Sequence, residues 1–262
     1  MDTLPSELVL AILELCPDDY VHLARTCRAW KTILDSEEYW AHQSMLLRAE
    51  PPPVMLQHPG FSWKLYFRHS VTFDRTVTTL RDKDLRYSPS GRSCECLAMH
   101  TDWGNLVLNR RFKKATVWLL FAGQMDVDKD RWRAGFMLEP NPYHVAGQTR
   151  SGWGFCNFDQ SFGHGGHWGS RRGPPFPDGV PLGLGFVEGL FFAQTGFRGY
   201  QESFTHAPLK QPASFVLSLK TPVLATVLGV TFPCAPELPS WMAGGCEDAV
   251  VGGSIPRVVP TD

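Results

Sequence analysis

Glycine divides this chain into two parts. The sequence holds 24 glycines in 262 residues, and none of them precedes Gly60. Helices avoid glycine because of its backbone freedom, whereas turns between strands need it. We therefore expect an α+β multidomain protein, with a small three-helix domain at the N-terminus followed by an antiparallel β-sandwich.

The first helix, expected over Ser6–Leu15, is more apolar than a surface helix needs to be. It carries two apolar stripes at helical spacing, one with Leu8 and Ile12 and the other with Val9 and Leu13. A domain of about forty residues buries too little surface to cover both stripes. Either one stripe meets a partner protein or the second packs on the rest of the chain, and periodicity leaves both alternatives open.

Two further helices are expected before residue 50. Asp18 or Asp19, just after the Pro17 break, can cap a second helix. Asp35 and Glu38 have the spacing of a capping box for a third short helix that continues through Tyr39 and Trp40.

The order of these residues resembles an F-box. Leu4-Pro5 begins the pattern, Cys27-Arg28-Ala29-Trp30 follows the second apolar helix, and Tyr39-Trp40 ends it. F-boxes bind a Skp-type adaptor, which docks them on a cullin–RING ubiquitin ligase. The resemblance implies these adaptor-facing residues: Leu4, Pro5, Leu8, Ile12, Leu13, Leu23, Cys27 and Trp30.

After residue 70 the chain shows short apolar or alternating runs between turn residues, which is typical of antiparallel strands. Glu188-Gly189 has the character of a tight hairpin turn. The expected strands are Thr72–Leu80, Cys94–Met99, Leu106–Leu108, Thr116–Phe121, Trp132–Leu138, Gly152–Phe158, Val180–Phe186, Leu190–Phe192, Phe215–Leu219 and Ala225–Phe232.

A second resemblance lies within this β region. The stretch Ser151–Leu184, with Gly189–Gly196, Leu219-Lys220-Thr221-Pro222 and Trp132-Arg133-Ala134-Gly135, resembles a SPRY domain. The resemblance implies a two-sheet antiparallel sandwich that binds proteins or peptides through loops at one end. The expected division is F-box 1–48, Pro-rich and aromatic linker 49–69, SPRY-like sandwich 70–235 and irregular tail 236–262.

The loop Gln160–Asp178 is the first candidate for part of a substrate surface, because exposed Trp and Arg carry much of the binding energy at interfaces. The alternative is that Trp168 and Phe176 fill the sandwich core, as we expect of Trp103, Trp118, Trp132 and Trp153. The candidate substrate-binding residues are His164, His167, Trp168, Arg171 and Arg172.

No motif indicates catalysis, a cofactor or a metal. Cys94 and Cys96 share one face of a strand, but zinc sites space paired cysteines more widely, so structural cysteines are the expectation. The acidic run Asp126–Asp130 lacks the Gly and Glu that a calcium loop needs, which favours a solvated turn. No Ser or Cys is accompanied by a recognisable base and orienting group.

The charge balance argues against a nucleic acid or a membrane as partner. The formal net charge is −1; residues 1–50 hold nine acidic and four basic side chains, which leaves about +4 for the rest. Seven scattered cysteines and no recognisable signal peptide or spanning run favour a reduced cytoplasmic or nuclear protein.

These observations predict a non-catalytic substrate-recognition subunit of a Skp–cullin–F-box ubiquitin ligase. The F-box would bind the adaptor and the SPRY-like domain a target protein. The alternative is an F-box/SPRY interaction protein, or a viral decoy, that acts outside a cullin ligase. An enzyme in the β region has only the weak His and Cys clusters in its favour.

Overall fold

The computed structural model describes most of the chain after residue 27. The described residues are 28–46, 51, 53–78, 80–98, 100, 102–123, 131–140, 144–170, 173–187, 189–196, 201–205, 211–233, 238–239 and 242. The first two predicted helices therefore lie outside the described residues.

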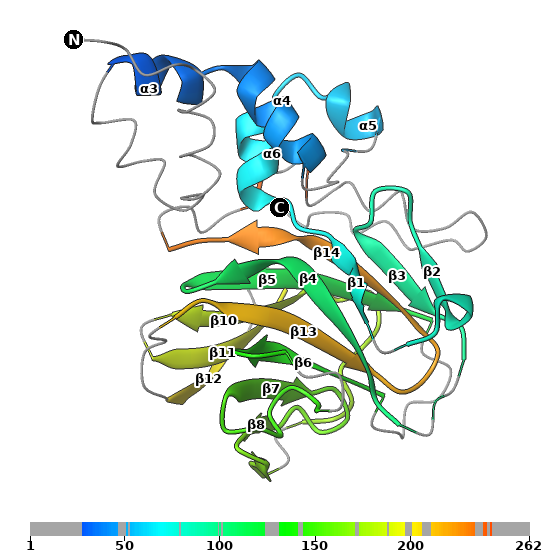
Figure 1. Cartoon of the computed structure of the whole chain (residues 1–262). Coiled ribbons are helices and arrows are strands. Elements are labelled where there is room, and N and C mark those ends of the chain that lie inside the picture. Colours follow the sequence, from blue (N-terminus) through cyan, green and yellow to red (C-terminus); the bar gives the residue numbers. More distant parts are fainter. Residues whose placement is uncertain are drawn as a thin grey trace.

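The described N-terminal residues are helical, as the absence of glycine predicted. The helices are α3 (Arg28–Leu34), α4 (Glu37–Leu46), α5 (Pro53–Leu56) and α6 (Trp63–His69). Figure 1 shows them gathered on one side of the sandwich, above strand β14. Within the described ranges, no helix has the length and apolar character needed to cross a bilayer.

The cap of α4 differs from the sequence-based expectation. The hydroxyl of Ser36, rather than the Asp35 carboxylate, accepts a hydrogen bond from the Tyr39 N–H, and it donates to Glu38. Asp35 instead pairs with Lys64 of α6 at 3.0 Å. The capping box was therefore predicted one residue too early, because Ser36 offers the same capping chemistry and Asp35 has a tertiary partner that the sequence does not reveal.

Two antiparallel sheets of seven strands form the rest of the described structure. Sheet A has the strand order β1-β4-β13-β6-β7-β8-β9, and sheet B has the order β12-β11-β10-β5-β14-β3-β2. The strands of sheet A are β1 (Phe73–Thr78), β4 (Gly104–Phe112), β6 (Trp132–Met137), β7 (Gly152–Cys156), β8 (Phe162–His164), β9 (His167–Trp168) and β13 (Ala213–Leu219). Those of sheet B are β2 (Leu85–Tyr87), β3 (Ser93–Cys96), β5 (Ala115–Ala122), β10 (Leu182–Val187), β11 (Leu190–Thr195), β12 (Gln201–Thr205) and β14 (Val223–Thr231).

All ten predicted strands are present, although their ends shift by a few residues. Strands β2, β8, β9 and β12 are additional. The first part of the predicted loop Gln160–Asp178 is the hairpin of β8 and β9. Val187 pairs with Leu190 on either side of the predicted Glu188-Gly189 turn, and Glu188 itself lies outside the described residues.

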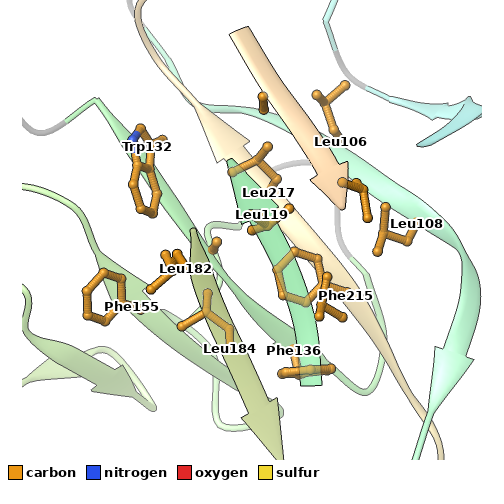
Figure 2. Packing of buried hydrophobic residues seen from close by; sticks show 14 of the residues in the cluster. Leu106, Leu108, Leu119, Trp132, Phe136, Phe155, Leu182, Leu184, Phe215 and Leu217 are labelled. Carbon is orange, nitrogen blue, oxygen red and sulfur yellow. The ribbon is translucent and has the colours of Figure 1, made fainter. Parts of the chain in front are cut away.

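The main core lies between the two sheets. Every second side chain of a strand points inward, as the period of a β-strand requires. Figure 2 shows inward side chains from both sheets interdigitating, among them Trp132 of β6 and Leu182 of β10. The Trp132 ring stacks on Phe121 with centroids 3.9 Å apart. Alternation of this kind makes the outward residues of each strand available for other contacts.

The predicted linker, residues 49–69, contains α5 and α6. Helix α6 packs on α4, and it also contacts β14. Tyr66 is fully buried with Met55 of α5 and Met242. The aromatic stretch of this segment therefore joins the N-terminal helices to the sandwich.

Three residues of the predicted irregular tail are described, and two of them, Leu238 and Met242, pack against other elements. Leu238 contacts Trp118 and Leu228 on the outer face of sheet B. Met242 is fully buried beneath α5 and α6. Part of residues 236–262 is thus anchored to the domain.

Candidate functional site

A row of three glycines crosses the outer face of sheet A. Gly135 of β6 pairs with Gly154 of β7, and Gly154 pairs with Gly163 of β8. A Cβ added at Gly154 would collide with the backbone of Ala146. The row therefore lets another part of the chain lie directly against the sheet.

Among the described residues, the segment 144–149 lies over part of this outer face. The Asn105 side chain of β4 donates to the His144 carbonyl at 2.9 Å, and it accepts from the Ser218 hydroxyl at 2.6 Å. Both side chains are buried. The polar outward positions of β4 and β13 thus hold the segment in place.

The Trp168 ring packs over Gly163, the last glycine of the row. It pairs with Gly163 across β8 and β9, and a Cβ at Gly163 would come within 2.6 Å of the Trp168 ring. A Cβ at Gly147, which has φ +90°, would come within 3.0 Å of the same ring. Glycine at both positions leaves the space that the half-buried indole occupies.

Four half-buried side chains on this face form an alternating row of cations and rings. The Arg133 guanidinium carbon lies 4.3 Å from the Trp168 ring centroid and 5.0 Å from that of Trp103. The Lys220 ammonium lies 5.8 Å from the Trp103 centroid. We call Lys220, Trp103, Arg133 and Trp168 the cation–tryptophan row; contacts of this kind favour a cation over the electron-rich ring face.

The topology explains why these four residues meet. Arg133 points outward because its neighbours Trp132 and Ala134 fill the core. Trp103 directly precedes β4, and Lys220 directly follows β13. Since Leu219 pairs with both Gly104 and Trp132, the ends of three strands lie at one level of the sheet.

The structure divides the predicted substrate residues between two faces. His164 and His167 pair across the β8–β9 turn, so they lie on one face and Trp168 on the other. The His164 ring stacks on Trp153, and its Nδ1 lies 2.8 Å from the Gly152 carbonyl oxygen. Because that oxygen can only accept, His164 Nδ1 carries the proton. His167 is exposed, and Arg171 and Arg172 lie outside the described residues.

The rest of the predicted loop is anchored in the core. Phe176 is buried against Trp132 and Phe155, and its N–H donates to the Asn157 carbonyl at 2.7 Å. Gln160 donates from its side chain to the Pro174 carbonyl at 2.9 Å. Phe176 is therefore a core residue and Trp168 is half-exposed, while the substrate-binding role of this loop stays a prediction.

A buried arginine lies at the same end of sheet A. Arg131 is 2% exposed, and its carbonyl accepts from the Lys220 N–H at 2.9 Å. Its Nη2 has no hydrogen-bond partner among the residues that the structure describes. The backbones of Arg131 and Lys220 are therefore hydrogen-bonded at this end of the sheet.

Sequence reasoning assigned no binding role to Trp103, Arg133 or Lys220. Trp103 was expected in the core, and it instead lies half-buried between Arg133 and Lys220. Trp132 and Trp153 are core residues as expected, while Trp118 packs with Leu120 and Leu228 in a separate cluster. The alternation Trp-Arg-Ala on β6 was a signal that Arg133 points outward, but only the strand order brings it to Trp168.

On the N-terminal side, one predicted adaptor-facing residue is described. Trp30 is half-buried and packs against a cluster of Leu34, Tyr39, Trp40 and Phe67. The other predicted adaptor-facing residues, Leu4, Pro5, Leu8, Ile12, Leu13, Leu23 and Cys27, lie outside the described residues.

The predicted structural cysteines of β3 are buried and free. Burial raises the pKa of the Cys94 thiol to about 12, and it also raises that of Cys96. Across the described ranges, no group of three or more His, Cys, Asp or Glu side chains is arranged to hold a metal ion.

The comparisons with known proteins match the N-terminal part and the β-sandwich of the chain separately. A family model described as F-box-like matches residues 1–45. No curated protein matches this chain.

The sandwich is similar to solved SPRY structures. The TRIM65 PSpry domain is 17% identical, with a TM-score of 0.47 over 63% of this chain and 95% of that one. The SPRY domain of human HERC1 is 8% identical, with a TM-score of 0.46 over 59% and 96% of the two chains. The NEUZ domain of Neuralized from Drosophila melanogaster is 10% identical, with a TM-score of 0.44 over 61% and 91%.

Proposed function

We propose that this chain is a substrate-recognition subunit of a Skp–cullin–F-box ubiquitin ligase. Residues 1–45, which match an F-box-like family model, would bind the Skp-type adaptor. The SPRY-like sandwich would hold a target protein. The observation that carries the proposal is the presence in one chain of an F-box-like segment and a β-sandwich with a half-exposed cation–tryptophan row.

The arrangement of the described residues supports such a role. Helix α6 packs on α4 and on β14, so the helical part is tied to the sandwich. In Figure 1 the helices lie above β14, while β8 lies at the opposite end of the view. An adaptor and a target would thus bind well-separated surfaces, and ligation would gain its rate from proximity supplied by the complex.

The chain itself would be non-catalytic in this role. Its part would be binding and positioning, and the transfer chemistry would belong to other subunits. It would need no cofactor, and it would work in the reducing cytoplasm or nucleus, where its free cysteines persist.

Co-expression with a Skp-type adaptor, followed by size-exclusion chromatography, tests the proposal. We expect a stable one-to-one complex that also recruits a cullin. The variant Leu8→Asp with Leu13→Asp should lose the adaptor because two charges would enter an apolar interface.

A matched control uses leucines outside the F-box-like segment. Leu56→Asp with Leu65→Asp changes two exposed leucines of α5 and α6, and it should leave adaptor binding intact. Equal binding by the Leu8/Leu13 variant would contradict the interface. Adaptor binding without a cullin would favour the alternative, an interaction protein or decoy outside a cullin ligase.

A further inference from the structure

We propose that two C-terminal residues, Leu238 and Met242, hold the helical part of the chain on the β-sandwich. We call these two residues the C-terminal anchor. The inference deepens the proposed function and rests on it for its consequence, which is a fixed arrangement of the adaptor-binding and target-binding parts. The contacts themselves come from the geometry around strand β14.

The two residues of the anchor pack on opposite sides of the boundary between helices and sandwich. Leu238 packs against the hydrophobic cluster of Trp118 on the outer face of sheet B. Met242 is fully buried with Met55 of α5 and Tyr66 of α6. The anchor therefore contacts the sheet through one side chain and the helices through the other, although only four positions separate the two in sequence.

Gly229 of β14 is the point where the anchor meets the end of α6. A Cβ added at this glycine would lie 2.8 Å from Leu238 Cδ2, 3.3 Å from Met242 Cε and 3.1 Å from the His69 carbonyl oxygen. The Met242 N–H donates to the Pro239 carbonyl at 2.8 Å, which keeps the two anchor residues close together. Glycine in β14 thus leaves the space that the anchor and the helix end occupy.

The anchor supplies an apolar contact across this boundary. In the part of the chain that the structure describes, no hydrophobic cluster contains side chains from both a helix and a strand. Direct contacts across the boundary use polar or charged groups, such as the His69 ring on the Val230 carbonyl and Arg110 between the Phe67 and Phe232 rings. The anchor adds apolar burial, which is the main favourable term in packing.

This arrangement defines a partial opening in which the helices leave the sandwich while the strands stay paired. Such sub-global openings expose the amides of one unit and leave the rest protected. Met242 is buried between the two parts, so its substitution favours the open state. Met137 is equally buried, but it packs with Val107 and Val216 inside sheet A and stays buried in both states.

Hydrogen exchange of the full chain, read by mass spectrometry, tests the proposal. In Met242→Ala the α6 amides should exchange at least about tenfold faster, because the loss of a buried methionine side chain favours the open state. Leu238→Ala should accelerate the same amides at least about threefold, although Leu238 packs on the sheet. Met137→Ala is the matched control, which should accelerate exchange in β6 and β13 and leave α6 unchanged.

Unchanged α6 exchange in Met242→Ala would overturn the proposal. Equal acceleration of α6 by Met242→Ala and Met137→Ala would do the same, because α6 would then be released only when the sandwich unfolds. No effect of Leu238→Ala on α6 would make Met242 a core residue of the helices alone. Faster α6 exchange of the natural chain on dilution would assign the anchor to a second copy of the chain.

The measurement needs neither the adaptor nor the target. A chain that fails to bind a Skp-type adaptor contradicts the proposed function, whatever the exchange of α6. Unchanged α6 exchange in Met242→Ala contradicts the anchor, whatever the adaptor binding. Failure of the proposed function and failure of the anchor are therefore distinguishable.

Discussion

The Nδ1 atom of His69 lies 2.7 Å from the carbonyl oxygen of Val230, which ties the C-terminal end of α6 to β14. Arg110 of β4 strengthens the same joint by donating to the Arg68 carbonyl at 3.1 Å. The joint is buried, since His69 is only 2% exposed. Hydrogen bonds therefore connect the helices directly to the sandwich.

His69 should make stability depend on pH. Burial lowers its pKa from 6.5, the nearby Arg68 and Arg110 add to the effect, and the Val230 carbonyl opposes it. The unfolded chain therefore takes up this proton first as the pH falls. The stabilisation is complete above about pH 6.5 and is lost progressively below it.

The variant His69→Asn isolates this contribution. Its amide keeps a donor near the Val230 carbonyl but does not titrate. Urea unfolding at about pH 7.5 and about pH 5.5 should show a smaller fall in free energy of unfolding for the variant than for the natural chain. An identical fall in both proteins would assign the acid sensitivity to other groups.

We predict that Arg92, which connects β14 to α5, is important for the stability of the fold. It is buried, its Nε donates to the Val227 carbonyl at 3.1 Å, and another nitrogen donates to the Leu228 carbonyl. Its Nη1 contacts the Met55 sulfur of α5 at 3.6 Å. Arg92→Met should lower the free energy of unfolding by about 3 kcal/mol, because two buried carbonyls lose charged donors.

Arg86→Met is the control for this experiment. Arg86 forms an exposed ion pair with Glu95 at 3.3 Å. Such pairs contribute about 0–1 kcal/mol, so chemical denaturation should show little change. A loss as large as that of Arg92→Met would show that removal of any arginine destabilises this sheet.

Gly163→Ala tests whether glycine holds the place of Trp168. The new methyl group would lie 2.6 Å from the indole and would displace it from Arg133. We expect a cost of about 1–3 kcal/mol in denaturation experiments, because an overpacked site strains its neighbours. Gly169→Ala is the control, because its nearest neighbour, the Phe162 carbonyl oxygen, is 3.6 Å away. Unchanged stability in Gly163→Ala would contradict the close packing.

Cys94 should be chemically inert in the folded protein. Burial, with a smaller contribution from Cys96, raises its pKa to about 12, so the reactive thiolate is nearly absent at pH 8. Mass spectrometry after iodoacetamide treatment should find Cys94 unmodified in the native protein and alkylated in urea. Equal rates in the two conditions would contradict its burial.

Much of the β architecture could be predicted because alternation reports burial residue by residue. Trp132-Arg133-Ala134 reads as inward, outward, inward, and the structure places them so. Strands β8 and β9 were missed because two or three residues around Gly165-Gly166 are too few to show a period. The α4 cap was predicted one residue early because Asp35 and Ser36 have equivalent capping chemistry in sequence.

The sequence by itself determined the division into a helical and a β part, because glycine content and side-chain period act locally. It also determined that Trp132 and Trp153 lie in the main core, although Trp103 and Trp118 do not. Only the tertiary structure decided that Trp103, Arg133, Trp168 and Lys220 form one row, because they meet through pairing among strands far apart in the chain. The same holds for His69 and Val230, which are separated by 161 positions in sequence and 2.7 Å in space.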